Sequence, residues 1–94
     1  MIIISQDKSE IINFDNTLNI CIYPKYDDLD NEIGYEIFAG MKAPDDNYRT
    51  LGYYKTQKRA QAVLEEIAER YFEYRVFANG YFSIVPKIYE MPKD

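Results

Sequence analysis

The stretch TQKRAQAVLEEIAERYFEYRVFA, residues 56–78, is the one long helical pattern in the sequence. Its apolar side chains recur at spacings of three and four residues, which places them on one face of a helix. They are Ala60, Leu64, Ile67, Ala68 and Tyr71, with Val63 and Tyr74 widening the stripe. Thr56 is the expected N-cap, because its hydroxyl can accept a hydrogen bond from a free backbone N–H of the first turn. The sequence therefore predicts an amphipathic helix that begins after Thr56 and ends near Ala78.

The Asn79-Gly80 dipeptide that follows this stretch fits two different structures. Gly80 in a left-handed conformation would cap the end of the helix. The same dipeptide also suits a type I′ turn between two strands. We favour the helix cap, because Tyr74 and Ala78 still continue the apolar stripe.

Short β-prone segments alternate with turn-forming segments before the helix. Five of them predict strands, at residues 2–4, 10–14, 18–23, 33–39 and 48–54. The polar loops between them are too short for helical crossovers, so the strands should be antiparallel. Pro24 is expected to end the third strand, because proline cannot donate to a β-ladder.

The predicted fold is α+β, in a single domain that spans residues 1–94. A meander of about five antiparallel strands is expected to pack against the one long helix. Residues 81–85 and 87–91, on either side of Pro86, would form an extended C-terminal segment. A strongly bent sheet capped by the helix, like a pleckstrin-homology fold, is the main alternative.

Several classes of function lack the residues that they require. The chain has no histidine and one cysteine, Cys21, which removes the usual catalytic triads, most zinc sites and an internal disulfide. Its four glycines are too scattered for a phosphate-cradling loop. We therefore predict a protein that is not an enzyme and that uses no cofactor and no metal ion.

Charge and hydropathy limit where the protein can be located and what it can bind. The net charge of −5 argues against nucleic acid as a partner, because binding a phosphate backbone requires clustered Lys and Arg. The apolar run at residues 1–4 is too short for a signal peptide or a membrane span. A lone Cys21 fits a reducing compartment. The sequence therefore predicts a cytoplasmic protein without membrane contact.

Three cations stand where a helix normally places acids. Lys55, Lys58 and Arg59 surround the start of the predicted helix, where the helix dipole is positive. Together with the free N–H groups of the first turn, they could hold a phosphate or a carboxylate. A solvent-exposed helix start that tolerates a small unfavourable charge is the explanation that we favour. We keep Lys55, Lys58 and Arg59 as candidate anion-binding residues.

Aromatic residues crowd the last quarter of the chain, and one helix face cannot bury all of them. Phe72 lies off the main stripe and Phe77 is marginal. A C-terminal segment that folds back over them is one explanation. A dimer or protein–protein interface, where Tyr and Phe are enriched, is the other. The candidate interface residues are Phe72, Phe77, Tyr81, Phe82 and Tyr89.

Several stretches resemble small uncharacterised proteins of phages and mobile elements of Gram-positive bacteria (Firmicutes). IISQDK at residues 3–8 with IINFDN at 11–16 is similar to their opening. LGYYKT at 51–56, with Ala60, Val63 and Leu64, is similar to their strand-to-helix junction, and YEMP at 89–92 to their ending. The resemblance carries no biochemical activity and transfers no site residue. It implies a bacterial cytoplasm and an accessory role in a prophage or integrated element.

These observations together favour a small non-enzymatic interaction protein that binds a protein partner or a second copy of itself. The aromatic excess near the end of the chain carries this interpretation. An anion-binding or nucleic-acid-binding module that uses the basic start of the helix is the alternative.

Overall fold

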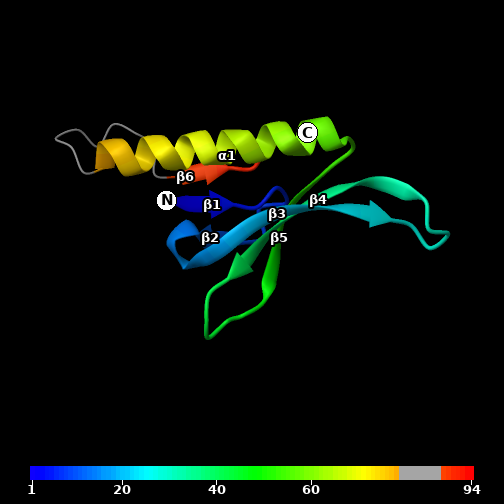
Figure 1. Ribbon diagram of the computed structural model, residues 1–94, viewed down its shortest axis with the longest axis horizontal. Coiled ribbons are helices and arrows are strands. Elements are labelled where there is room, and N and C mark those ends of the chain that lie inside the picture. Colours follow the sequence, from blue (N-terminus) through cyan, green and yellow to red (C-terminus); the bar gives the residue numbers. More distant parts are fainter. Residues whose placement is uncertain (79–87) are drawn as a thin grey trace.

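The strands form two three-stranded sheets, and one helix lies along them (Figure 1). The computed structural model describes residues 1–78 and 88–94, and for residues 76–78 it describes the backbone alone. The first sheet has the order β2-β1-β6, from β1 (Ile2–Ile4), β2 (Ile11–Asn13) and β6 (Ile88–Glu90). The second has the order β3-β4-β5, from β3 (Thr17–Tyr26), β4 (Glu32–Met41) and β5 (Tyr48–Tyr54). The 3₁₀-helix η1 (Phe14–Asn16) joins β2 to β3, and the helix α1 spans Gln57–Ala78.

The predicted helix is confirmed in its start and its N-cap, and α1 is described as far as Ala78. The Thr56 hydroxyl accepts a hydrogen bond of 3.1 Å from the Arg59 backbone N–H, which satisfies one of the free donors of the first turn. The choice between a cap and a hairpin turn at Asn79-Gly80 lies outside the described residues.

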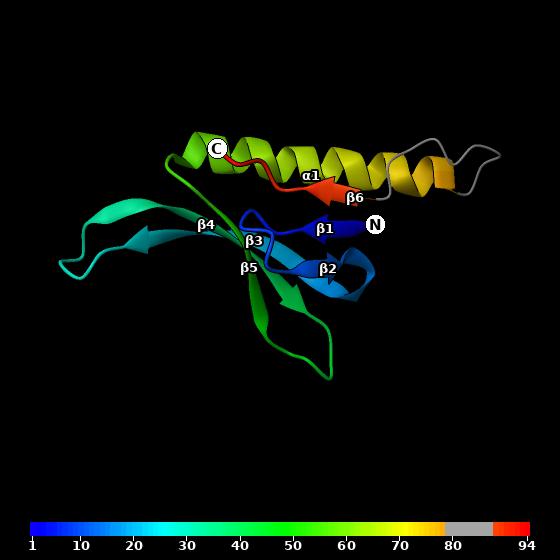
Figure 2. The ribbon, with the colours of Figure 1, turned by 180° about the vertical axis from the view of Figure 1, so that it is seen from behind.

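The α+β class is confirmed, but the single five-stranded meander is wrong. All five predicted strands exist and pair antiparallel with their chain neighbours, except that β2 and β3 belong to different sheets. η1 intervenes between β2 and β3, and the second side of β1 is taken by β6 from the far end of the chain. β6 runs parallel to β1, with Ile3 opposite Tyr89 (Figure 2). The described strands do not close into a barrel.

The third strand continues beyond Pro24, which corrects the expected end. β3 runs to Tyr26, and Pro24 lies opposite Tyr35 of β4. β3 is at the edge of its sheet, where a proline removes no ladder bond if its nitrogen faces away from the partner strand. Pro24 therefore does not end β3. It restricts the hydrogen bonds that another strand could form with the outer edge of β3.

One hydrophobic core joins both sheets to α1. Its residues come from the first sheet and its flanks, from the second sheet, and from the helix: Met1, Ile3, Ile12, Tyr89 and Met91; Ile37, Ala39, Met41, Leu51 and Tyr54; Ala60, Val63 and Ile67. The two hairpin tips, between β3 and β4 and between β4 and β5, project away from this core (Figures 1 and 2).

The buried face of α1 is rotated from the one that the sequence predicts. Ala60, Val63 and Ile67 are at most 2% exposed, whereas Leu64 is half-buried and Ala68 is exposed. Val63 was expected only to widen the stripe, yet it lies at the centre of the buried face. The rotation leaves Leu64 and Ala68 at the margin of the core, on the side of β3.

No helix in the described part of the chain combines the length and the apolar character needed to cross a membrane.

Candidate interaction surface

An apolar groove runs between the edge strand β3 and the helix α1. Its volume is about 230 Å³. The residues that line it come from η1, β3 and α1: Phe14, Thr17, Leu18, Asn19, Ile20, Leu64, Ile67 and Ala68. Leu18 is 71% exposed beside this groove, although a leucine stabilises a folded chain only when it is removed from water. We call this feature the β3–α1 groove.

The helix side of the groove extends as a stripe along α1. Leu64, Ala68 and Phe72 follow one another at intervals of four residues, which aligns them on one side of a helix. Phe72 is 68% exposed, and the ring of its neighbour Tyr71 packs 4.3 Å from the ring of Phe14, which lines the groove. Phe72 therefore extends the apolar surface of the groove toward the end of the helix.

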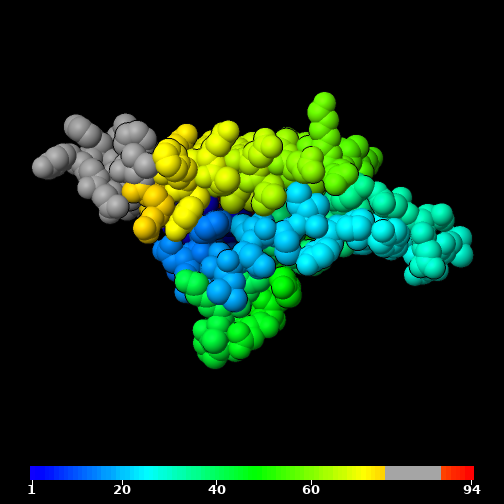
Figure 3. Space-filling view, in the orientation of Figure 1, coloured from blue at the N-terminus to red at the C-terminus, as the bar shows by residue number. Residues whose placement is uncertain are grey.

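The strand side of the groove is an open sheet edge. β3 pairs with β4 on one side, and no described strand pairs with its other side. Its ten residues carry no charged side chain between Thr17 and Tyr23. Edge strands usually carry charges that prevent pairing with another chain, because their unpaired N–H and C=O groups otherwise recruit one. In Figure 3, β3 lies open between α1 and the hairpin of β4 and β5.

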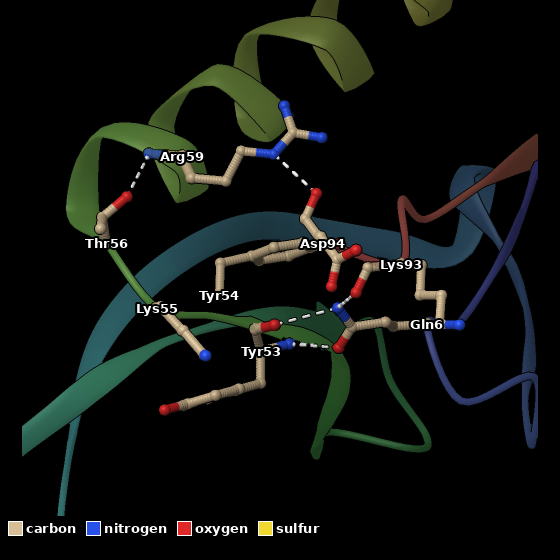
Figure 4. A pocket seen from close by; sticks show the side chains of 8 residues that line it. All are labelled: Gln6, Tyr53, Tyr54, Lys55, Thr56, Arg59, Lys93 and Asp94. Carbon is tan, nitrogen blue, oxygen red and sulfur yellow. Dashed lines mark hydrogen bonds between the residues drawn. The ribbon is translucent and has the colours of Figure 1, made fainter.

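The opposite edge of the same sheet is covered. The Gln6 side chain pairs with the Tyr53 backbone in both directions, since its Oε1 accepts from the N–H at 2.8 Å and its Nε2 donates to the C=O at 2.9 Å (Figure 4). The Gln6 backbone N–H donates to the Leu51 carbonyl at 2.7 Å. Gly52 leaves room for two side chains, because a Cβ there would lie 3.0 Å from the Tyr54 hydroxyl and 3.3 Å from the Gln6 Cβ. Gln6 thus takes the place of a neighbouring strand on β5.

The basic residues at the start of α1 border a pocket of about 620 Å³. Lys55, Arg59 and Lys93 line this pocket, whereas Lys58 does not. The Arg59 Nε donates a 2.8 Å hydrogen bond to the main-chain oxygen of Asp94. Lys55 and Lys93 point in other directions (Figure 4). The candidate residues Lys55, Lys58 and Arg59 therefore do not converge on one point. The Arg59 guanidinium is already hydrogen-bonded to Asp94.

A second apolar patch lies on the open face of the β3-β4-β5 sheet. Tyr23, Phe38 and Tyr48 line a shallow hollow of about 360 Å³, and the rings of Tyr23 and Phe38 are 6.0 Å apart. The neighbouring Cys21 raises the pKa of the Tyr23 hydroxyl, and the Cys21 Sγ lies 4.0 Å from the Phe38 carbonyl oxygen. Cys21 is thus on the sheet face that points away from the groove.

The predicted interface aromatics divide into three groups. Phe72 is exposed at the groove, as described above. Tyr89 is 3% exposed in the shared core, and its hydroxyl donates to Glu66 Oε1 at 3.1 Å. Burial, and secondly this bond, raise the pKa of Tyr89. A side chain enclosed in this way is part of the core and not of a surface. Tyr81, Phe82 and the side chain of Phe77 lie outside the described residues.

The groove is not evident from the sequence, because its walls also fit core positions. The alternating pattern predicts Leu18 in a half-buried strand, and the helical spacing predicts Leu64 and Ala68 on the buried helix face. The spacing of Leu64, Ala68 and Phe72 was the available signal, because a stripe that includes an aromatic residue on the exposed side indicates a second apolar face.

Within residues 1–78 and 88–94, no three Cys, Asp or Glu side chains are placed to hold a metal ion together. Comparison of the chain with protein-family models, with curated proteins and with solved structures finds no match.

Proposed function

We propose that this chain is a non-enzymatic protein-interaction protein whose contact surface is the β3–α1 groove. The observation that carries the proposal is the combination, at one place, of an unpaired sheet edge and an apolar groove. Backbone groups of the edge supply directional hydrogen bonds, and the groove supplies apolar area for a partner's side chains. Leu18 and Phe72 would contribute much of the area that binding removes from water.

The position of the exposed apolar residues supports this surface over the basic start of α1. Large side chains exposed singly are ordinary on a protein surface, but contiguous apolar patches mark interaction sites. Leu18 and Ile11 illustrate the difference, because both are 71% exposed and only Leu18 lines the groove. At the start of α1, Arg59 is already bonded to Asp94.

The resemblance to phage and mobile-element proteins gives this function a setting. In that setting the chain would be an accessory protein in a bacterial cytoplasm, acting by binding another protein and not by chemistry.

Quantitative affinity capture from the native cells, followed by mass spectrometry, tests the proposal. Leu18→Glu should abolish recovery of the bound protein, because a buried carboxylate without a partner is costly. Ile11→Glu is the matched control, since Ile11 has the same exposure on the other sheet. Equal recovery with wild type, Leu18→Glu and Ile11→Glu would show that the groove is not the contact surface.

A further inference from the structure

We propose that the partner in the β3–α1 groove is a second copy of this chain, and that the two β3 strands pair antiparallel across a twofold axis. The inference rests on the function proposed above, because it names the partner of the same surface. The result would be a continuous six-stranded sheet with both helices on one side.

The symmetry of an antiparallel strand pair suits this edge. A twofold axis perpendicular to the sheet keeps each side chain on its own face, so that the same patch of both copies meets itself. Ile20 and Ile22 pack against the core under α1, and Leu18 lines the groove. The register of β3 shifts between Thr17 and Asn19, so Leu18 lies at an irregularity of the strand. Pairing within residues 17–23 places these side chains beside their counterparts in the second copy. The groove of one copy continues into the groove of the other.

Pro24 and the charges at the two ends of β3 restrict the pairing. Pro24 has no N–H to donate, which confines a regular ladder to the part of the strand before it. The exposed Asp15 precedes the uncharged segment and Lys25 follows it. The Lys25 Nζ already lies 3.3 Å from Glu36 Oε1 of its own copy. In an antiparallel pair, Asp15 of the other copy would add a second carboxylate near Lys25, at both ends of the shared ladder. Opposite charges at these positions favour this orientation, whereas a parallel pair would bring like charges together.

The apolar residues along α1 provide a surface against which the apolar residues of the second copy can pack. Leu18 of one copy projects beside the β3 strand of the other, where Ile20, Leu64 and Ala68 form an apolar wall. Phe72 continues this wall along α1 and is covered as the two helices approach. One contact thus removes from water two of the most exposed apolar side chains, at 71% and 68% exposure.

Sedimentation equilibrium at tens of micromolar gives the first readout. Wild type and Ile11→Glu should be dimers, and Leu18→Glu should be a monomer with an unchanged circular dichroism spectrum. A second pair of variants covers the case in which Leu18→Glu does not fold. Ala68→Arg should give monomers, and Ala62→Arg, also an exposed helix alanine but outside the groove, should remain dimeric.

A spin label on the single thiol of the chain, Cys21, can test where the interface lies. Cys21 lies on the sheet face that points away from the groove, so a nitroxide label there leaves the groove clear. Pairing within residues 17–23 brings the two labels within roughly 20 Å, given about 3.3 Å per strand residue. Dipolar broadening of the electron paramagnetic resonance spectrum should therefore appear in wild type and disappear on dilution with unlabelled protein.

The outcomes separate this inference from the proposed function. A monomeric wild type that still captures another protein in a Leu18-dependent way overturns self-pairing and leaves the groove as a binding surface for a different chain. A dimer without dipolar broadening overturns the β3 pairing. A dimer that survives both Leu18→Glu and Ala68→Arg overturns self-pairing through the groove, and the capture experiment then decides the groove proposal by itself.

Discussion

The two sheets have the same number of strands but differ in what covers them. Each strand of β2-β1-β6 is three residues long, and the central β1 is paired on both sides. The strands of β3-β4-β5 have ten, ten and seven residues, and one edge of that sheet is open. Each short strand contributes one buried residue to the core. The longer sheet has more of the backbone pairing that makes a sheet stable by itself, and it buries residues of β4 and β5 but none of β3.

The contrast follows from how each sheet is stabilised. Three-residue strands make too few hydrogen bonds to persist alone, so the first sheet depends on distant segments such as β6 and on the shared core. The long hairpins of the second sheet are stabilised by many backbone pairs, although the register shifts at irregularities in both of them. A sheet of this kind can leave an edge and a face uncovered without unfolding, and those are the surfaces on which binding can occur.

The largest expected effect comes from the core of the shorter sheet. Ile3 is fully buried between β2 and β6, and Ile3→Ala should lower the free energy of unfolding by about 2–5 kcal/mol. Leu18→Ala, at the open edge of the longer sheet, should change it by within about 0.5 kcal/mol. Urea unfolding of both variants, at a protein concentration low enough to keep them monomeric, measures the difference. Similar losses would mean that Leu18 is as important to the folded core as Ile3.

A smaller effect is expected at Gln6, which joins the two sheets. Its side-chain amide bonds to Tyr53 of the second sheet and also donates to the carbonyls of Pro92 and Lys93, at 3.2 and 2.8 Å. Gln6→Ala should cost about 1–3 kcal/mol, because it leaves these backbone groups without their partner. Gln61→Ala, at an exposed position of α1, is the control and should cost within about 0.5 kcal/mol. A loss at Gln6 no greater than at Gln61 would refute its role as a link between the sheets.

Tyr54 of the longer sheet should make the stability of the fold depend on pH in the alkaline range. It is 2% exposed, and its hydroxyl donates to the Pro92 carbonyl at 2.8 Å. Burial raises the pKa of Tyr54 to about 12, whereas the unfolded chain releases this proton near pH 10. The free energy of unfolding should therefore fall as pH rises from about 10 to about 12.

Tyr54→Phe removes this titration, and at neutral pH it should cost about 0.5–1.5 kcal/mol for the lost hydrogen bond. Urea midpoints measured at pH 7, 10 and 11 test both parts. If wild type and Tyr54→Phe lose stability equally above pH 10, the contribution assigned to Tyr54 is wrong. Tyr89, whose pKa is also raised, remains in both proteins, so the comparison reports the difference that Tyr54 makes.

The smallest effect is expected in acid, at the turn between β1 and β2 and the turn between β3 and β4. Asp7 accepts hydrogen bonds from Ser9 and Ser5, which lower its pKa to about 2. Asp27 accepts from the backbones of Asn31 and Leu29, which lower its pKa as well. Both carboxylates stabilise the fold above the unfolded pKa of about 3.9 and lose that contribution as pH falls through their folded values.

Asp7→Asn should accordingly flatten the loss of stability between about pH 4 and pH 2. Thermal melts across this range, with Asp28→Asn as a control at an exposed residue of the other turn, measure the change. An acid profile of Asp7→Asn identical to that of wild type would contradict the role of this carboxylate.

Much of the fold could be predicted from the sequence, because its signals are local. The spacing of apolar residues and the Thr56 cap predicted the start of α1 and a helix that reaches about Ala78, and alternation with turn residues located all five strands that precede it. Each of these features depends on side chains within a few positions of one another. The groove was harder to predict, since every residue in its walls also fits an ordinary core position.

The sequence by itself thus determined which segments are helix and strand, the antiparallel hairpins, and the absence of histidine chemistry. Only the tertiary structure decided that β6 pairs with β1, that Gln6 closes the edge of β5, and that α1 buries Val63 instead of Ala68. Those outcomes depend on contacts between residues far apart in the chain. The free energy of such contacts is set by how the whole core packs, and no local pattern encodes it.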